Sequence, residues 1–124
     1  PESDRHIRAR RSPGPGNVLL ARLRYEHTDS VFAQFGQRGV SAGGVAKRLS
    51  KTVRTFAGNA VAVSHHLADQ LLVPMALGRG GAFSTLRPSK HALTNAAVIA
   101  RFLGPKVRFD EGEKERVFIC RVTA

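Results

Sequence analysis

Apolar residues recur along the chain with two different periods, which predict both strands and helices. Alternation of apolar and polar positions predicts strands over residues 18–25, 31–36, 82–86, 106–110 and 115–122. Apolar spacings of three and four predict helices over residues 42–57, from Ser64 to Gly78, and from about residue 90 to Leu103. Residues 1–16 show neither period and contain several Arg, Pro and Gly. We therefore expect a flexible basic arm or linker remnant over 1–16 and one folded module over 17–124.

The same spacings predict which side chains face the core. The inward positions are Leu19, Ala21, Leu23 and Tyr25 in the first strand, Val45, Leu49, Val53 and Phe56 in the first helix, and Val98, Ile99, Phe102 and Leu103 in the last helix. The apolar content of the helix after Ser64 marks that helix as buried. Helices that return between strands of one sheet are typical of an α+β fold. We therefore expect a two-layer α/β sandwich with its helices on one face.

Composition adds a strong bias of charge to a chain of ordinary size. The 124 residues are 42% apolar, which suits one domain with its own core, yet Lys and Arg number 20 against nine Asp and Glu, a formal net charge of +11. A polyanion is therefore the expected partner, although charge alone does not distinguish RNA, DNA and nucleotide. Four basic residues gather on the helix over 42–57: Lys47, Arg48, Lys51 and Arg54. Such a run forms either a solvated face or a binding face.

Cysteine usage and hydropathy bear on the compartment. The single cysteine, Cys120, cannot form an internal disulfide, which favours a reducing environment. No stretch approaches the roughly 20 apolar residues that cross a bilayer, and the first 12 residues lack a signal-peptide segment. We therefore expect a cytoplasmic protein without a membrane partner. The chain begins with Pro1 rather than Met, which favours a processed product or a fragment of a longer protein.

Histidines and one aspartate are the first candidates for chemistry. The histidines are His6, His27, His65, His66 and His91. His65 and His66 with Asp69 lack the further Cys or His ligands at the spacing that a zinc site needs, so no metal ligands are assigned. Asp69 lies within an apolar helix, where an unpaired carboxylate is costly. It therefore either makes a structural contact or holds a ligand.

His91 has the most informative local context. It falls in the first turn of a predicted helix beside Lys90, and Arg87 precedes it. A helix N-terminus presents unpaired N–H groups and the positive end of the dipole, so it attracts phosphate, and we expect Arg87 and Lys90 to neutralise phosphate there. The same setting favours an uncharged imidazole, which is a nucleophile able to attack phosphorus. The competing interpretation is a surface or capping histidine.

Two segments resemble the C-terminal part of the RNA 3'-terminal phosphate cyclases. They are His66–Leu77, which reads HLADQLLVPMAL, and Pro88–Asn95, which reads PSKHALTN. The GPGN at Gly14–Asn17 and the GVSA at Gly39–Ala42 are similar too. The resemblance spans about Gly14 to Val122. It implies a repeated module of the split βαβ type, like that of the enolpyruvate transferases, with this chain holding the last module and part of what precedes it.

The resemblance also implies an activity. Enzymes of this family use ATP and a divalent metal such as Mg or Mn to convert an RNA 3'-phosphate into a 2',3'-cyclic phosphate. By resemblance, His91 attacks the α-phosphorus of ATP to give an adenylylated histidine, AMP passes to the RNA 3'-phosphate, and the 2'-OH closes the ring and expels AMP. The implied ATP-binding residues are His66, Leu67, Ala68, Asp69 and Gln70. His66 stands where characterised enzymes can have a tyrosine stacked on adenine.

The resemblance is compatible with two functions, an enzyme and a non-catalytic module, and the length of the chain and His91 bear on the choice. Family enzymes are much longer, so we expect the isolated chain to bind polyanions weakly and not to turn over. The alternative is a non-catalytic basic module that binds RNA or assists ribosome assembly, using the basic face of the helix over 42–57. Relatives of that kind lack the nucleophilic histidine, so the presence of His91 favours the enzyme. The oligomeric state is not predicted.

Overall fold

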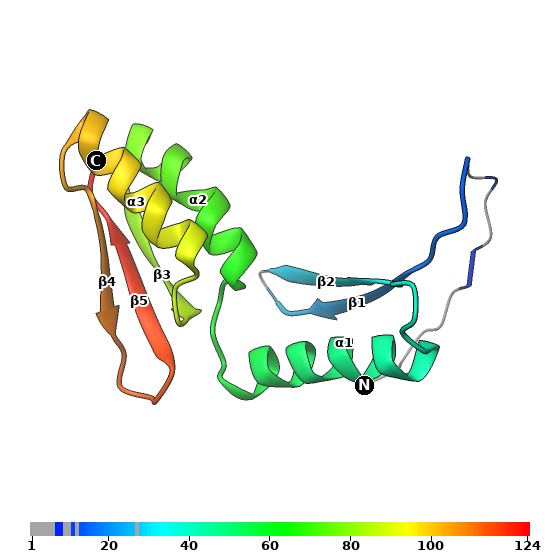
Figure 1. The fold of residues 1–124 in the computed structure, drawn as a ribbon. Helices are drawn as coiled ribbons and strands as arrows, with labels where there is room; N and C mark the ends of the chain where they lie inside the picture. The colour runs from blue at the N-terminus through cyan, green and yellow to red at the C-terminus, as the bar shows by residue number, and fades with distance from the viewer. Residues whose placement is uncertain (1–6, 9–10, 12, 27) are drawn as a thin grey trace.

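The computed structural model describes residues 7–8, 11, 13–26 and 28–124 (Figure 1). Most of the expected arm, with His6, and also His27 lie outside the described residues. The elements in chain order are β1 (Val18–Arg24), β2 (Asp29–Phe35), α1 (Ala42–Gly58), α2 (His65–Leu77), β3 (Gly81–Leu86), α3 (Lys90–Leu103), β4 (Val107–Glu111) and β5 (Val117–Val122). This order is the one that the sequence predicts, and the α+β class is confirmed. No helix in the described residues is long and apolar enough to span a membrane.

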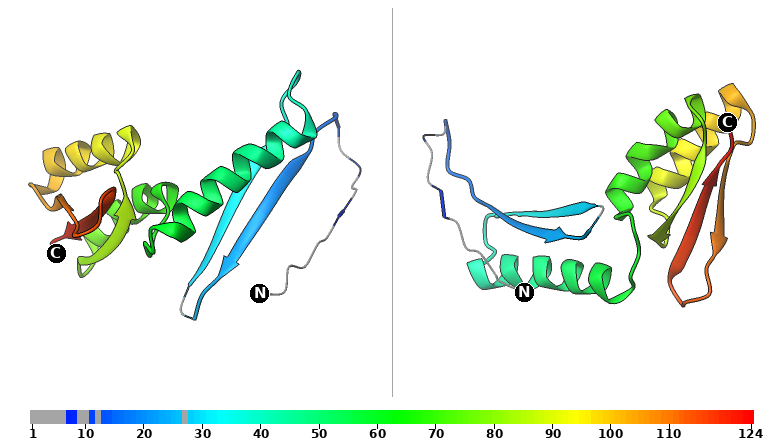
Figure 2. Two further views of the ribbon diagram at one scale, coloured as in Figure 1. Left: turned by 90° about the horizontal axis from the view of Figure 1, so that it is seen from below. Right: turned by 180° about the vertical axis from the view of Figure 1, so that it is seen from behind.

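The strands form two sheets, whereas we expected one. β1 pairs with β2, and β3, β5 and β4 form a separate antiparallel sheet in that order. The cause is α1, whose 17 residues carry the chain about 25 Å away from the first hairpin before the second sheet begins. Figures 1 and 2 show α1 along one face of the β1–β2 pair, and α2 and α3 together on one face of the other sheet. The two-layer arrangement therefore holds within each half.

The second half contains a split βαβ unit. β3 and β4 both run antiparallel to β5, so they are parallel to each other, and α3 joins them while β5 lies between. A parallel bridge between Val63 and Thr85 shows that the segment before α2 also runs parallel to β3. Since α2 and α3 each leave the carboxyl end of one of these parallel segments, the two helices run the same way. Their N-termini lie at the same edge of the sheet.

Two apolar clusters hold the chain together. One joins the second sheet to its helices: Leu72, Ala76, Ala92, Ile99, Cys120 and Val122. The other joins β2, α1 and the segment after α1: Phe32, Leu49, Phe56 and Val61. Leu86 and Val117 reach from the second sheet onto this second cluster. The two halves of the chain are therefore in apolar contact.

Burial of the helices is narrower than the sequence analysis expected. On α3, Ile99 is 4% exposed, but Phe102 is 81% exposed, and Val98 and Leu103 are exposed as well. α2 is not buried all round either: it buries the stripe of Ala68, Leu72 and Ala76 and leaves Leu67, Val73 and Leu77 exposed. The reason is geometric, because a helix on one sheet buries residues spaced by three and four and turns the intervening positions to solvent.

The first strand is also less buried than expected. Ala21 and Leu23 pack against the second cluster, but Leu19 and Tyr25 are exposed. In α1 itself the prediction is confirmed, with Val45, Leu49 and Phe56 buried and Val53 packed against the cluster. The face of β1–β2 away from α1 carries exposed apolar side chains: Val18, Leu20, Val31 and Phe35.

Serine begins each helix. The hydroxyls of Ser41, Ser64 and Ser89 accept a backbone N–H from the third residue beyond, with distances of 3.1, 3.4 and 3.1 Å. These caps satisfy one of the otherwise unpaired donors of each first turn. They explain why the predicted starts of the helices agree with the structure, since the Ser caps at 41 and 64 are visible in the sequence.

The thiol of Cys120 tests the packing of the second sheet. Cys120 is fully buried, and burial raises its pKa to about 11. We expect no reaction of the native chain with a disulfide reagent at about pH 8, because both access and thiolate are lacking. The absorbance of the thiol that the reagent releases should rise only when guanidinium unfolds the chain. Labelling of the native chain as fast as the unfolded chain would contradict this packing.

Thr85 tests the cost of an unpaired polar group. Its hydroxyl is fully buried in β3 and has no hydrogen-bond partner among the residues that the structure describes. Thr85→Val keeps the shape and removes the unpaired group, so the free energy of unfolding should rise by about 1 kcal/mol. Thr85→Ser is the control, because it keeps the hydroxyl, loses a buried methyl and should lower stability. Urea unfolding measures both, and a less stable valine variant would refute the prediction.

Candidate functional site

The first turns of α2 and α3 lie together at one edge of the second sheet. The link between them is Asn95, whose Nδ2 donates to the carbonyl oxygen of Asp69 at 3.1 Å and to its Oδ1 at 3.2 Å. His91 precedes Asn95 by one helical turn, and His66 precedes Asp69 by about one turn. Because the helices are parallel, His91 and His66 lie at the same level of this edge.

Asp69 makes the structural contact that the sequence left open. The residue is half-buried and faces α3 through its bond to Asn95. The sequence analysis gave Asn95 no role, although it lies within the segment quoted for the resemblance. The usable signal is its spacing, since a residue four positions after His91 falls on the same helix face. Contact of Asp69 with ATP stays a prediction.

His91 is exposed at the start of α3 and is not enclosed in the apolar interior. Arg87 and Lys90 are exposed beside it in sequence, and Ala92 is fully buried, which anchors this turn on the sheet. Neither α2 nor α3 has an acidic residue in its first turn. The positive ends of two helix dipoles therefore remain unneutralised at this edge, where an anion is favoured.

The predicted ATP-binding segment 66–70 is one continuous stretch of α2, so its members do not share a face. His66 and Gln70 are exposed and four residues apart, which places them on one side of the helix. Ala68 is fully buried, and its N–H donates to the Ser64 carbonyl at 2.8 Å, so it anchors the helix. A ligand on the outer side of α2 therefore meets His66 and Gln70 rather than Ala68.

Two adjacent histidines stack at the start of α2. The rings of His65 and His66 have centroids 4.1 Å apart and are tilted by 38°. Burial lowers the pKa of His65 below its usual value, and the nearby His66 lowers it further. His65 is half-buried while His66 is exposed, so the pair consists of a shielded inner ring and an outer ring in solvent.

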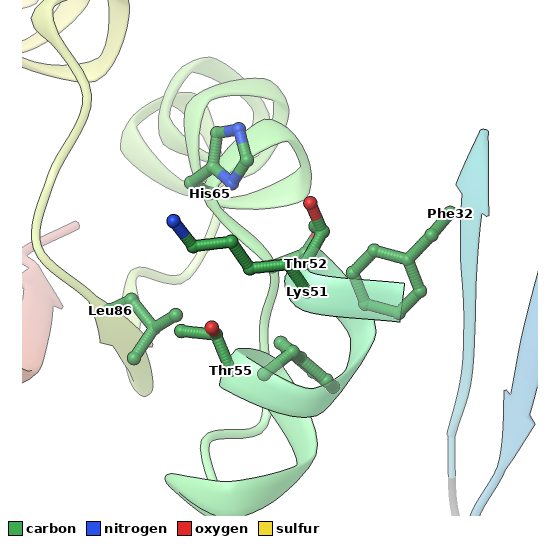
Figure 3. A pocket seen from close by; sticks show the side chains of 8 residues that line it. Phe32, Lys51, Thr52, Thr55, His65 and Leu86 are labelled. Atoms are coloured by element: carbon green, nitrogen blue, oxygen red, sulfur yellow. The ribbon is translucent and has the colours of Figure 1, made fainter. Parts of the chain in front are cut away.

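A cavity of about 240 Å³ opens beside this histidine pair (Figure 3). It is lined by Phe32 of β2, by Lys51, Thr52, Thr55 and Phe56 of α1, by Ser64 and His65 at the start of α2, and by Leu86 of β3. Figure 3 shows the Lys51 side chain extending toward His65 and Leu86, away from Phe32. Sequence analysis did not predict this cavity, because it is assembled from four separate elements.

The described residues offer no ready metal site. Within this part of the chain, no three His, Cys, Asp or Glu side chains are grouped so as to hold a metal ion. The described residues therefore supply no set of protein ligands for the divalent cation that the resemblance implies.

Together, these elements define a split βαβ module with two helix N-termini at one edge that carry no acidic residue in their first turns. The chain belongs to the RNA 3'-terminal phosphate cyclase family, since its residues 13–109 match that family. It is 44% identical over 110 residues to an RNA 3'-terminal phosphate cyclase of Salmonella enteritidis, covering 89% of this chain and 32% of that protein.

Two further curated relatives carry the same name. The relative from Koribacter versatilis is 38% identical over 115 residues, covering 93% of this chain and 32% of its own length. The relative from Pseudomonas aeruginosa is 46% identical over 94 residues, covering 76% and 28%. The chain therefore spans about a third of the length of the curated relatives that it matches. The resemblance stated from the sequence is confirmed at the level of the family.

His65 gives the module a dependence on pH. The pKa of His65 in the folded chain lies below the ordinary value of 6.5, so the unfolded chain binds this proton more readily. The contribution of His65 to stability is therefore full above about pH 6.5. It is lost as the pH falls through about 6.5 toward the pKa of the folded chain. The urea midpoint should therefore drop between about pH 7.5 and pH 5. His65→Gln should reduce this drop, because it removes the group whose pKa differs between the folded and the unfolded chain. An equal drop in the His65 variant and the unsubstituted chain would contradict the assignment.

Proposed function

We propose that this chain is the C-terminal catalytic segment of an RNA 3'-terminal phosphate cyclase, which uses ATP to convert an RNA 3'-phosphate into a 2',3'-cyclic phosphate in the cytoplasm. Membership of the family makes RNA 3'-ends the expected substrate class. The observation that carries the proposal is the exposed imidazole of His91 at a helix start beside Lys90, at an edge with no acidic residue in either first turn.

The proposed reaction begins on the His91 ring. One ring nitrogen with a free lone pair attacks the α-phosphorus of ATP, an N–P bond forms, and the bond to the pyrophosphate oxygen breaks. An oxygen of the RNA 3'-phosphate then attacks the same phosphorus and releases the imidazole, leaving AMP joined to the RNA. Finally the 2'-OH attacks the 3'-phosphorus, loses its proton and expels AMP. Three simpler displacements at phosphorus thereby replace one difficult condensation.

The surrounding residues have supporting roles in this proposal. The free N–H groups of the first turn of α3, together with Lys90 and Arg87, stabilise the negative charge of the phosphates around the reacting phosphorus. His66 and Gln70 meet the nucleotide from α2, with the His66 ring stacking on adenine. Asp69 is held by Asn95, and this bond keeps the nucleotide segment of α2 level with His91. A divalent cation, Mg or Mn, supplies additional charge neutralisation when it is bound.

The length of the relatives supports a requirement for further parts. Because the chain matches about a third of each relative, we propose that the rest of such an enzyme completes the ATP and RNA sites. The isolated chain then binds polyanions weakly and does not turn over.

A chimera tests the role of His91. This chain would replace the matching third of the Salmonella enteritidis relative, and the product would be incubated with ATP labelled in the α-phosphate. We expect labelled AMP to attach to the chimera and to be lost by at least 100-fold in His91→Ala, because covalent catalysis has no substitute nucleophile. Affinity for RNA should change little. The isolated chain serves as the companion sample and should acquire no AMP.

The rival function is a non-catalytic basic module that binds RNA. The observation in its favour is that Lys47, Arg48, Lys51 and Arg54 are all exposed on α1. The rival function predicts that no labelled AMP attaches to the chimera, whether residue 91 is histidine or alanine. The same labelling experiment therefore decides between the two functions. An active parent relative, run in parallel, shows that the assay works.

A further inference from the structure

The lining of the cavity beside α2 has an apolar part and a polar part. Phe32 and Phe56 form the floor with Leu86, and their ring centroids are 5.1 Å apart with a tilt of 59°. These two rings are 8% and 3% exposed, so the floor is fixed by the second apolar cluster. Thr52 and Thr55 supply hydroxyls to the lining. A fixed apolar floor with a few polar groups is the usual form of a small-molecule subsite.

The volume of this cavity limits its occupant. Pockets for drug-sized molecules measure about 300–1,000 Å³. At about 240 Å³ the cavity is smaller, and it suits a single planar ring system rather than a whole dinucleotide. Aromatic side chains accept any nucleobase in this way because every base has an apolar face.

Positive charge leads into the cavity along α1. Lys47, Lys51 and Thr55 follow at intervals of four, so they lie on one line of the helix, and both lysines are exposed. Arg48 and Thr52 form the neighbouring line. Since α1 contains no Asp or Glu, this face is uniformly basic. The N-terminus of α2 opens on the same cavity through Ser64 and His65. An apolar socket next to several cations matches a base joined to a phosphate.

The cavity is separate from the proposed nucleotide segment. His65 lines the cavity, whereas His66, stacked on it, begins the segment assigned to ATP. The occupant of the cavity therefore lies next to the ATP residues and not among them. Since His65 lines the cavity and His66 lies level with His91, an RNA strand whose 3'-end is at His91 can reach the cavity with an upstream nucleotide.

We propose that this cavity is a subsite for an unpaired nucleotide upstream of the RNA 3'-end, with its base against the apolar lining of Phe32, Phe56 and Leu86 and its phosphate on Lys51. The assignment rests on the proposed function only in taking RNA as the substrate. The basic line of Lys47 and Lys51 then holds the backbone of the same strand. Apolar contact does not read the hydrogen-bonding edges of the base, so the subsite tolerates all four bases.

Lys51→Gln tests the phosphate contact in the chain as it is. Binding of a fluorescent single-stranded RNA decamer with a 3'-phosphate would be followed by anisotropy over a series of salt concentrations. We expect affinity to fall several-fold and the slope of log K against log salt to shrink by about 0.7, the value for one phosphate of a single strand. Lys114→Gln, in the turn between β4 and β5, removes an equal charge elsewhere and should change neither. Equal effects of the two variants would overturn the proposal.

Thr55→Phe tests the base socket. The larger side chain fills the cavity, so RNA binding should weaken several-fold while binding of inorganic polyphosphate stays the same. Thr94→Phe, on an exposed position of α3, is the matched control, and circular dichroism with thermal melting checks that both variants fold. If RNA binding is unchanged, or if polyphosphate binding falls equally, the cavity is not a base site. These measurements need no ATP, so their failure leaves the test of His91 untouched.

Discussion

The arrangement of the two helix starts depends on one amide. Asn95 holds the backbone and the carboxylate of Asp69 with the same nitrogen, so it fixes α2 and α3 both in distance and in register. A slip of one turn would move either helix by about 5.4 Å and separate His91 from the level of His66. The buried Ala68 and Ala92 anchor the two helices on the sheet, and the amide adds a directional bond between the helices that apolar contact alone does not supply.

Positive charge in this chain has two different origins. On α1 it comes from side chains, which are mobile, hydrated and screened by salt. At the edge of the second sheet it comes partly from oriented backbone N–H groups, which need no side-chain ordering to meet an anion. The first kind attracts a polyanion from a distance, and the second favours one phosphate at one position. In the proposed enzyme, the side-chain charge on α1 attracts the RNA strand, and the backbone charge at the edge of the sheet holds the reacting phosphates.

Local signals predicted the order of elements well. Serine caps and periodic apolar residues set the helices, and the family motif pointed to the edge that carries His66 and His91. Properties that depend on distant segments were not predictable in this way. The division into two sheets follows from the length and direction of α1, and the exposure of Phe102 follows from which stripe of α3 meets the sheet. The cavity is formed by side chains from four elements, so no single stretch of sequence predicts it.

The hairpin of β1 and β2 has a consequence for handling the protein. A sheet of two strands has two edges, and its outer face carries Val18, Leu20, Val31 and Phe35 in solvent. Such a ribbon is a template onto which another copy can add by backbone pairing. Both strand edges and this apolar face are thus open to a second copy, so dilution series belong at the start of solution work on this chain.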